Sequence, residues 1–137
     1  MSSLQETFSP DGPLARAING YRVRAQQVDM AERIATAING CSVFIAEAGT
    51  GTGKTFAYLV PALQSGGKVI VSTGTKTLQD QLFNKDLPMV REALKAPVRI
   101  ALLKGRANYV CPYHLRRASA ASSRVRKRPS ASARWRW

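Results

Sequence analysis

The chain has 137 residues, enough for one domain, and its hydrophobic fraction of 45% is ordinary for a globular protein. Its apolar runs are only a few residues long and its N-terminus has no basic and then apolar leader, so we expect neither a membrane span nor a secretory signal. The formal charge of +13 divides into +5 for residues 1–114 and +8 for residues 115–137, so a nucleic-acid argument from net charge would depend mostly on the C-terminal tail.

The first third of the chain is expected to form an arm, a helix and a strand. Residues 1–20 are weakly patterned and are predicted to be an N-terminal arm with a short helical turn at residues 14–18. Residues 25–39 are predicted to be a helix, because apolar residues recur on one face; they are Val28, Ala31, Ala35 and Ile38. Residues 41–46 are apolar on both faces, which predicts a strand inside a parallel sheet, with Cys41 as a small buried side chain.

Residues 47–55 carry the pattern of a phosphate-binding loop. They follow an apolar run and precede an amphipathic one, the strand–loop–helix setting that such a loop needs. Three glycines leave the backbone without Cβ atoms, so successive N–H groups can converge on phosphate oxygens. Lys54 would then reach the β- and γ-phosphates, and the Thr55 hydroxyl would ligate Mg²⁺. The predicted nucleoside-triphosphate site consists of Glu47, Ala48, Gly49, Thr50, Gly51, Thr52, Gly53, Lys54 and Thr55.

One position departs from the pattern of this loop, G-x-x-x-x-G-K-[ST]. Ala48 stands where the first glycine belongs, and it fits there if its φ is negative. A flexible Gly/Thr loop that binds nothing is the alternative, but the Gly-Lys-Thr ending and the two flanking elements favour a nucleotide.

After the loop, the chain is predicted to return from a helix to a second strand. The helix covers residues 53–64, with Pro61 expected to bend it or end it early. Residues 68–72 are apolar and predict a second buried strand.

The next segment repeats that alternation. Thr73 or Thr75 is expected to cap a third helix that runs to about Asn84. A connection that contains proline then leads to a third strand at residues 98–103. Strands alternating with helices predict βαβ units, and therefore an α/β fold with a parallel sheet and flanking helices.

The amino-acid composition of the chain changes at residues 115–137. They are almost entirely Arg, Ala and Ser, with no acidic residue and no helical or strand period, so they are predicted to be a disordered basic tail. Trp135 and Trp137 alternate with arginines, as in tails that bind nucleic acid or a membrane surface. Translation in a wrong reading frame is an equally good explanation of this tail.

Four blocks, in order and at consistent spacing, resemble the N-terminal part of the DinG/XPD-type iron–sulfur DNA helicases, most closely the bacterial YoaA-like branch. They are residues 24–30, 47–63, 71–82 and 103–112. The resemblance covers about residues 8–114. It implies a P-loop NTPase fold, with a partial RecA-like ATP-binding domain at residues 21–114 that follows the arm at residues 1–20.

The resemblance also implies a ligand for each block. Gln27 matches the glutamine that contacts the adenine edge of ATP, and Arg24 is nearby in the same block. Without the resemblance, Gln27 would be interpreted as an exposed glutamine at the start of a helix. Lys54 and Thr55 match the catalytic end of the loop that binds ATP and Mg²⁺. The third block matches a segment that touches the phosphates of single-stranded DNA, through Thr73, Gly74, Thr75, Lys76 and Gln79. These threonines are equally compatible with simple turn and cap roles.

Relatives of this kind also hold a [4Fe–4S] cluster on four cysteines and unwind DNA in the 5′-to-3′ direction. Cys111 matches the first of the four cysteines. Such a cluster needs four thiolates, whereas Cys41 and Cys111 are the only cysteines of the chain, so no cluster is expected here. Two cysteines far apart in sequence indicate a reducing cytoplasm rather than a disulfide framework.

The chain also lacks parts that turnover requires. The acids after the loop are Asp80, Asp86 and Glu92, none of them in a DEAH-like pair that would position Mg²⁺ and the attacking water. A reading-frame shift after about residue 114 would explain both this and the tail. Three functions stay open: the ATP-binding segment of a helicase, a non-catalytic module that binds nucleotide or nucleic acid, and a remnant without function.

Overall fold

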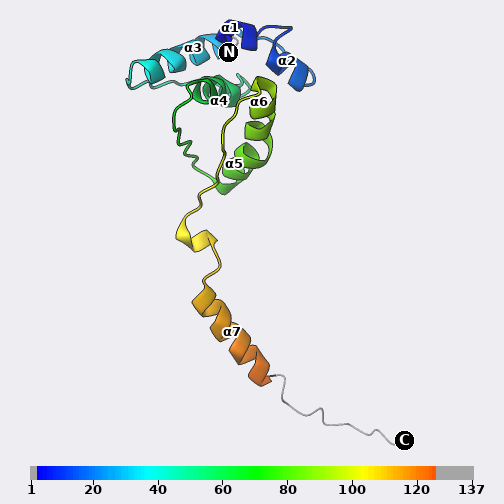
Figure 1. Cartoon of the computed structure of the whole chain (residues 1–137), viewed down its shortest axis with the longest axis vertical. Helices are drawn as coiled ribbons and strands as arrows, with labels where there is room; N and C mark the ends of the chain where they lie inside the picture. Colours follow the sequence, from blue (N-terminus) through cyan, green and yellow to red (C-terminus); the bar gives the residue numbers. More distant parts are fainter. Residues whose placement is uncertain (1–2, 126–137) are drawn as a thin grey trace, which may run out of the picture. The chain divides into compact units, whose positions relative to one another are not determined.

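The computed structural model describes residues 3–125, which form helices joined by turns and extended segments (Figure 1). The chain divides into two compact units, Met1–Ala101 and Leu102–Trp137. The first unit holds α1 Leu4–Thr7, α2 Pro13–Ala17, α3 Ala25–Asn39, α4 Lys54–Gln64, α5 Lys76–Gln81, the π-helical turn η1 Leu82–Asp86 and α6 Leu87–Leu94. The second unit holds the 3₁₀ turn η2 Arg106–Asn108 and α7 Pro112–Val125.

The helix predicted over residues 25–39 is confirmed as α3. The next helix, α4, begins one residue later than predicted and runs through Pro61 to Gln64, so the expected early end at Pro61 is wrong. Proline removes one hydrogen bond from a helix, but Pro61 is buried, and its packing offsets that loss.

The third predicted helix is longer than expected. Its cap is Thr75, whose Oγ1 accepts a hydrogen bond from the Leu78 N–H at 3.2 Å. After α5 the chain continues through η1 into α6, so most of the connection predicted between about Asn84 and residue 98 is helical, and only the part after Leu94 is a connection. Pro88 cannot donate to the carbonyl four residues back, and the wider π turn ahead of it, closed by the Leu87 N–H on the Leu82 carbonyl, accommodates this.

The core of the first unit includes residues from the segment predicted to be an arm. Buried apolar side chains from α2, α3, α4, η1 and α6, and from the turn after α1, form one cluster; they are Phe8, Leu14, Ala31, Ala57, Leu59, Val60, Leu82 and Val90. Phe8 and Leu14 are fully buried. The N-terminal helices therefore pack against α3 and α6 and complete the core (Figure 1).

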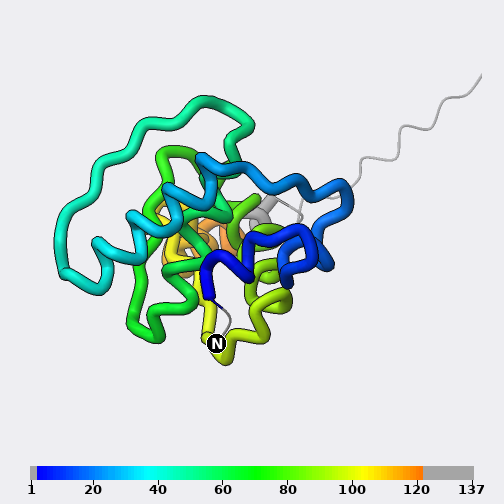
Figure 2. Tube along the Cα trace, turned by 90° about the horizontal axis from the view of Figure 1, so that it is seen from above, coloured from blue at the N-terminus to red at the C-terminus, as the bar shows by residue number. Residues whose placement is uncertain are grey.

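The three predicted strands do not form within residues 3–125, and that prediction is wrong for the described chain. The segments around residues 43, 70 and 103 are extended but unpaired, and the chain between α3 and α4 swings out as a wide arc (Figure 2). Val43, Ile45 and Ile70 are 89%, 90% and 96% exposed, so these segments leave apolar side chains uncovered. Helices close their hydrogen bonds locally, whereas a parallel strand needs partner strands from elsewhere in a chain.

Part of the predicted tail is also helical. Residues up to Val125 belong to α7, where the Arg117 guanidinium lies 5.5 Å from the centre of the Tyr113 ring. Disorder was therefore a wrong prediction as far as Val125, because Ala, Leu and Arg favour a helix even without a core to pack on. Residues 126–137, including Trp135 and Trp137, lie outside the described residues. Among the helices that are described, none is long and apolar enough to span a bilayer.

Candidate nucleotide-binding site

The loop before α4 has the conformation that its glycines allow. Gly51 and Gly53 have φ of 80° and 79°, in the left-handed region that L side chains rarely adopt, and Gly53 caps the N-terminus of α4. Ala48 is not among the residues with positive φ, so an alanine fits at the position of the first glycine in the loop pattern. Within residues 3–125, no protein acceptor takes the N–H groups of residues 50–53. These amides stand at the positive end of the α4 dipole, where an anion is favoured.

Lys54 draws this loop into a closed turn. Its Nζ donates to the Ala48 carbonyl at 2.6 Å and to the Gly49 carbonyl at 2.7 Å, and Thr52 Oγ1 donates to the same Gly49 carbonyl at 3.0 Å. The loop is thus curled around the ammonium group rather than extended or helical. This geometry puts a positive charge and several backbone amides within one turn of chain.

Gln27 joins the start of α3 to the end of this loop. Its side chain is 2% exposed, and Nε2 donates to the Gly53 carbonyl at 2.9 Å. The simple reading of Gln27 as an exposed residue is therefore wrong. Oε1 of Gln27 is buried and has no hydrogen-bond partner in the described part of the chain. An unsatisfied buried acceptor costs about 1–3 kcal/mol, so this atom is suited to accept from a ligand.

Arg24 lies on the same side of the loop. A Cβ placed on Gly53 would collide with the Gln27 carboxamide and would lie 3.5 Å from Arg24 Nη1. The structure thus brings Arg24, Gln27, Gly53 and Lys54 together, whereas Glu47 is exposed.

Thr55 is followed on α4 by Tyr58, three residues further along the helix and half-buried. Burial raises the pKa of the Tyr58 hydroxyl. The i, i+3 spacing of Thr55 and Tyr58 was available in the sequence. Asp86 in η1 is also buried, which no local signal in the sequence indicated.

The predicted DNA-contacting residues form one turn at the start of α5. Thr73 Oγ1 donates to the Thr75 carbonyl at 3.2 Å, and Thr75 caps the helix. Gly74 and Lys76 are exposed, and Gln79 is half-buried in α5. The capping role expected for a threonine is therefore present, and it leaves the outer face of this turn open to a ligand.

Both cysteines are exposed. The prediction that Cys41 is buried is wrong, because Cys41 adopts a left-handed turn with φ of 49° after α3 instead of starting a strand. Cys111 lies in the second unit, just before α7. Over the described residues, no group of three or more metal-ligating side chains comes together.

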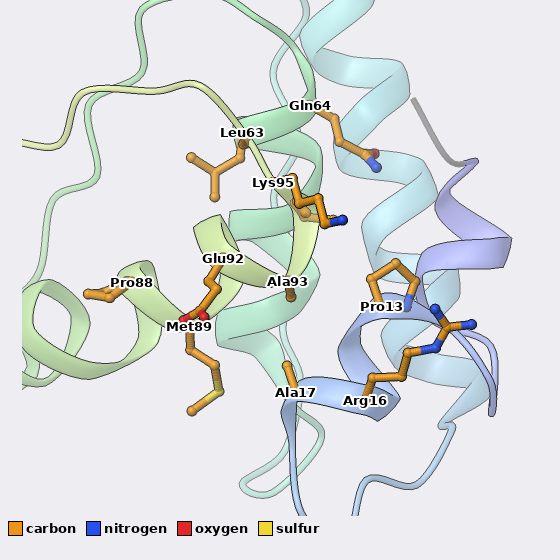
Figure 3. A pocket seen from close by; sticks show the side chains of 12 residues that line it. Pro13, Arg16, Ala17, Leu63, Gln64, Pro88, Met89, Glu92, Ala93 and Lys95 are labelled. Carbon is orange, nitrogen blue, oxygen red and sulfur yellow. The ribbon is translucent and has the colours of Figure 1, made fainter.

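A cavity of about 810 Å³ lies at the far end of α4, lined by residues of α2, α4 and α6 (Figure 3). Leu63 and Gln64 line it, and Gln64 is ten residues along α4 from Lys54, which is about 15 Å at the rise of an α-helix. Arg16 and Glu92 stand at its sides. The cavity is therefore separate from the loop around Lys54.

Comparison with known proteins identifies the family. Residues 27–110 match the family of DEAD/DEAH box helicases. Over 110 residues the chain is 56% identical to the ATP-dependent DNA helicase YoaA of Haemophilus influenzae, and over 108 residues 54% identical to that of Escherichia coli. It is 41% identical over 121 residues to the ATP-dependent helicase DinG of Mycobacterium tuberculosis.

These alignments cover most of this chain but a small part of each relative. They include 80%, 79% and 82% of the chain, which spans only 17%, 17% and 18% of the length of those relatives. No solved structure matches the chain. The resemblance inferred from the four sequence blocks is confirmed, and the chain belongs to the DEAD/DEAH box helicase family.

Proposed function

We propose that residues 21–114 are part of the first RecA-like domain of an ATP-dependent DNA helicase and supply its ATP-binding segment. The observation that carries this proposal is the closed turn of residues 48–54 around the Lys54 ammonium at the N-terminus of α4. The names of the relatives support it, since YoaA and DinG are described as ATP-dependent helicases. The chain would work in the reducing cytoplasm that its two separated cysteines indicate.

The residues of the turn fit a nucleotide with Mg²⁺. The left-handed glycines and the unbonded N–H groups suit phosphate oxygens, and the buried Oε1 of Gln27 suits the amino group of adenine. Lys54 and Thr55 would act on the terminal phosphates and on Mg²⁺, and bound ATP supplies the phosphoryl group for hydrolysis. The proposed ATP site comprises Arg24, Gln27, Glu47, Ala48, Gly49, Thr50, Gly51, Thr52, Gly53, Lys54 and Thr55.

The parallel sheet is proposed for the longer protein. The unpaired segments around residues 43, 70 and 103 carry exposed apolar residues, which a sheet would bury between neighbouring strands. The chain spans under a fifth of the length of these relatives, and we propose that partner strands correspond to parts of the relatives beyond this alignment. We also propose that Cys111 ligates an iron–sulfur cluster only in a protein that supplies three further cysteines.

The decisive experiment removes the charge inside the turn. Lys54→Ala is expected to weaken binding of a fluorescent ATP analogue by at least about tenfold, because an ammonium–phosphate pair and the closed turn are lost together. Lys68→Ala, which alters an exposed lysine outside the turn, is the matched control and should leave the affinity unchanged. Equal affinity in the parent chain and Lys54→Ala contradicts the proposal.

Hydrolysis separates the leading function from its alternative, a module that binds without turnover. We expect the chain to bind the analogue but not to hydrolyse ATP above background, with or without DNA, because the acids after the loop, Asp80, Asp86 and Glu92, form no DEAH-like pair in the sequence. Hydrolysis that Lys54→Ala abolishes would show that the missing carboxylates are not required.

For DNA, we propose contacts from Thr73, Gly74, Thr75, Lys76 and Gln79 to the phosphates of a single strand. Lys76→Ala is expected to lower the dependence of log K on log salt by about 0.7, the value for one single-strand phosphate contact. Lys85→Ala, in the exposed part of η1, should leave that slope unchanged. Binding that disappears when residues 115–137 are deleted, with no effect of Lys76→Ala, would assign the affinity to the basic tail alone.

A further inference from the structure

The second unit, Leu102–Trp137, carries cations without anions. Its sequence contains lysines and arginines but no Asp or Glu, so its positive charges have no acidic partner within the unit. Residues 105–121 are all exposed, which places their side chains in contact with solvent rather than with a core. A surface of a single positive sign attracts a polyanion, and it does so without any contact to the phosphate loop of the first unit.

Three planar side chains at the start of α7 contact one another. The Arg117 guanidinium lies 5.5 Å from the centre of the Tyr113 ring, and Arg117 Nη1 donates to the Tyr113 hydroxyl at 3.2 Å. The His114 ring meets the Tyr113 ring edge-on, with centroids 5.3 Å apart and an angle of 73° between the planes. Tyr113 is nevertheless 62% exposed. This Tyr113 cluster (Tyr113, His114 and Arg117) therefore fixes an aromatic ring in place and leaves it accessible.

A second exposed ring lies just before α7. Tyr109 is 54% exposed, and its hydroxyl accepts a hydrogen bond from the Lys104 backbone N–H at 3.0 Å. Between these residues, Asn108 Nδ2 donates to the Gly105 carbonyl at 3.2 Å, which closes the turn. Like Tyr113, Tyr109 thus has a bonded hydroxyl and an exposed ring. A ring whose orientation is already fixed loses little conformational entropy when a ligand stacks on it.

The composition of α7 favours a nucleic acid over a membrane surface. A helix that lies in a bilayer interface presents a face of large apolar residues. In contrast, α7 consists mostly of Ala, Ser and Arg, and its large aliphatic residues are Leu115 and Val125. Aromatic rings next to arginines are typical of surfaces that bind single strands, because bases stack on the rings while cations contact the phosphates. The bond to Tyr113 uses one of the five N–H donors of Arg117, so the same guanidinium can also contact a phosphate.

We propose that the Tyr113 cluster, together with Tyr109, is a base-stacking site for a single-stranded nucleic acid, with Arg117 contacting a phosphate of the bound strand. The site lies in the second unit and shares no residue with the DNA contacts proposed at residues 73–79 or with the ATP site. It does not depend on the proposed function. Every base has a π-face, so the site binds strands without reading their sequence.

The test compares the affinities of the full chain for two fluorescent oligonucleotides of equal length, an oligothymidylate and an abasic strand. Tyr113→Leu removes the ring and keeps an apolar side chain. It is expected to weaken oligothymidylate binding at least about fivefold, the effect of losing one stacked base, and to leave the affinity for the abasic strand within about twofold of the parent. Tyr113→Phe keeps the ring and should retain the preference for oligothymidylate. Leu115→Ala is the matched control, because Leu115 is also exposed on α7 but has no ring.

The salt dependence of oligothymidylate binding tests the role of Arg117. Arg117→Gln should lower the slope of log K against log salt by about 0.7, the value for one single-strand phosphate contact, whereas Tyr113→Leu removes no charge and should leave the slope unchanged. Lys54→Ala should change neither measurement, which separates this site from the proposed ATP site. An unchanged slope in Arg117→Gln overturns the phosphate contact.

Three outcomes would overturn the stacking site. In the first, Tyr113→Leu weakens the binding of both strands equally, and in the second it weakens neither. In the third, Tyr113→Leu weakens binding to vesicles of phosphatidylcholine and phosphatidylserine but not to oligothymidylate, which would assign the exposed rings to a membrane surface.

Discussion

Phe8→Ala is expected to destabilise the first unit strongly. Phe8 is fully buried in the cluster that α3, α4 and α6 share, although it lies in a segment that the sequence pattern describes only as an arm. Truncating a buried phenylalanine to alanine costs about 3–5 kcal/mol, through lost transfer free energy and the cavity left behind. A small domain has a total stability of about 5–15 kcal/mol, and the extended apolar segments of this chain contribute little to it.

The measurement is urea unfolding followed by the circular dichroism of the helices. Ile70→Ala is the matched control, because Ile70 is 96% exposed and its truncation removes almost no buried surface. The midpoint should fall sharply for Phe8→Ala and stay within error for Ile70→Ala. Equal midpoints for the two variants would mean that the N-terminal helices do not contribute to the core in solution.

Gly53→Ala is expected to abolish nucleotide binding while the helices persist. The φ of 79° costs an alanine about 1–2 kcal/mol, and the new methyl group would collide with the Gln27 carboxamide that now bonds to the Gly53 carbonyl. The variant must therefore move either the cap of α4 or the side chain of Gln27, and both belong to the proposed ATP site. We expect the affinity for the ATP analogue to fall by at least about tenfold.

Two other glycines of the loop provide a graded control. Gly51 has φ of 80° but open space around it, so Gly51→Ala introduces backbone strain without a collision. Gly49 has neither a positive φ nor an atom within 4 Å of a new Cβ. The loss of affinity should therefore decrease in the order Gly53, Gly51, Gly49. A loss that is equal at all three positions would point to phosphate access rather than to the contact between Gly53 and Gln27.

The helices and the phosphate loop could be predicted because their signals are local. α3 has its apolar face at helical spacing, Thr75 caps α5, and the glycines of residues 49–53 stand next to Lys54. The place of Gln27 beside Gly53 could be expected only from the family resemblance, since 26 residues separate the two. No local signal indicated that Pro88 would lie inside a helix after a π turn.

The amino-acid sequence alone determined the family, the phosphate loop and most of the helices, since each depends on neighbouring residues whose hydrogen bonds and conformations are satisfied within a few positions. Tertiary structure alone decided that Phe8 and Leu14 complete the core, that Asp86 is buried, and that the three apolar segments stay unpaired. Those outcomes depend on contacts between distant parts of a chain, and a strand remains unpaired until another strand satisfies its backbone groups.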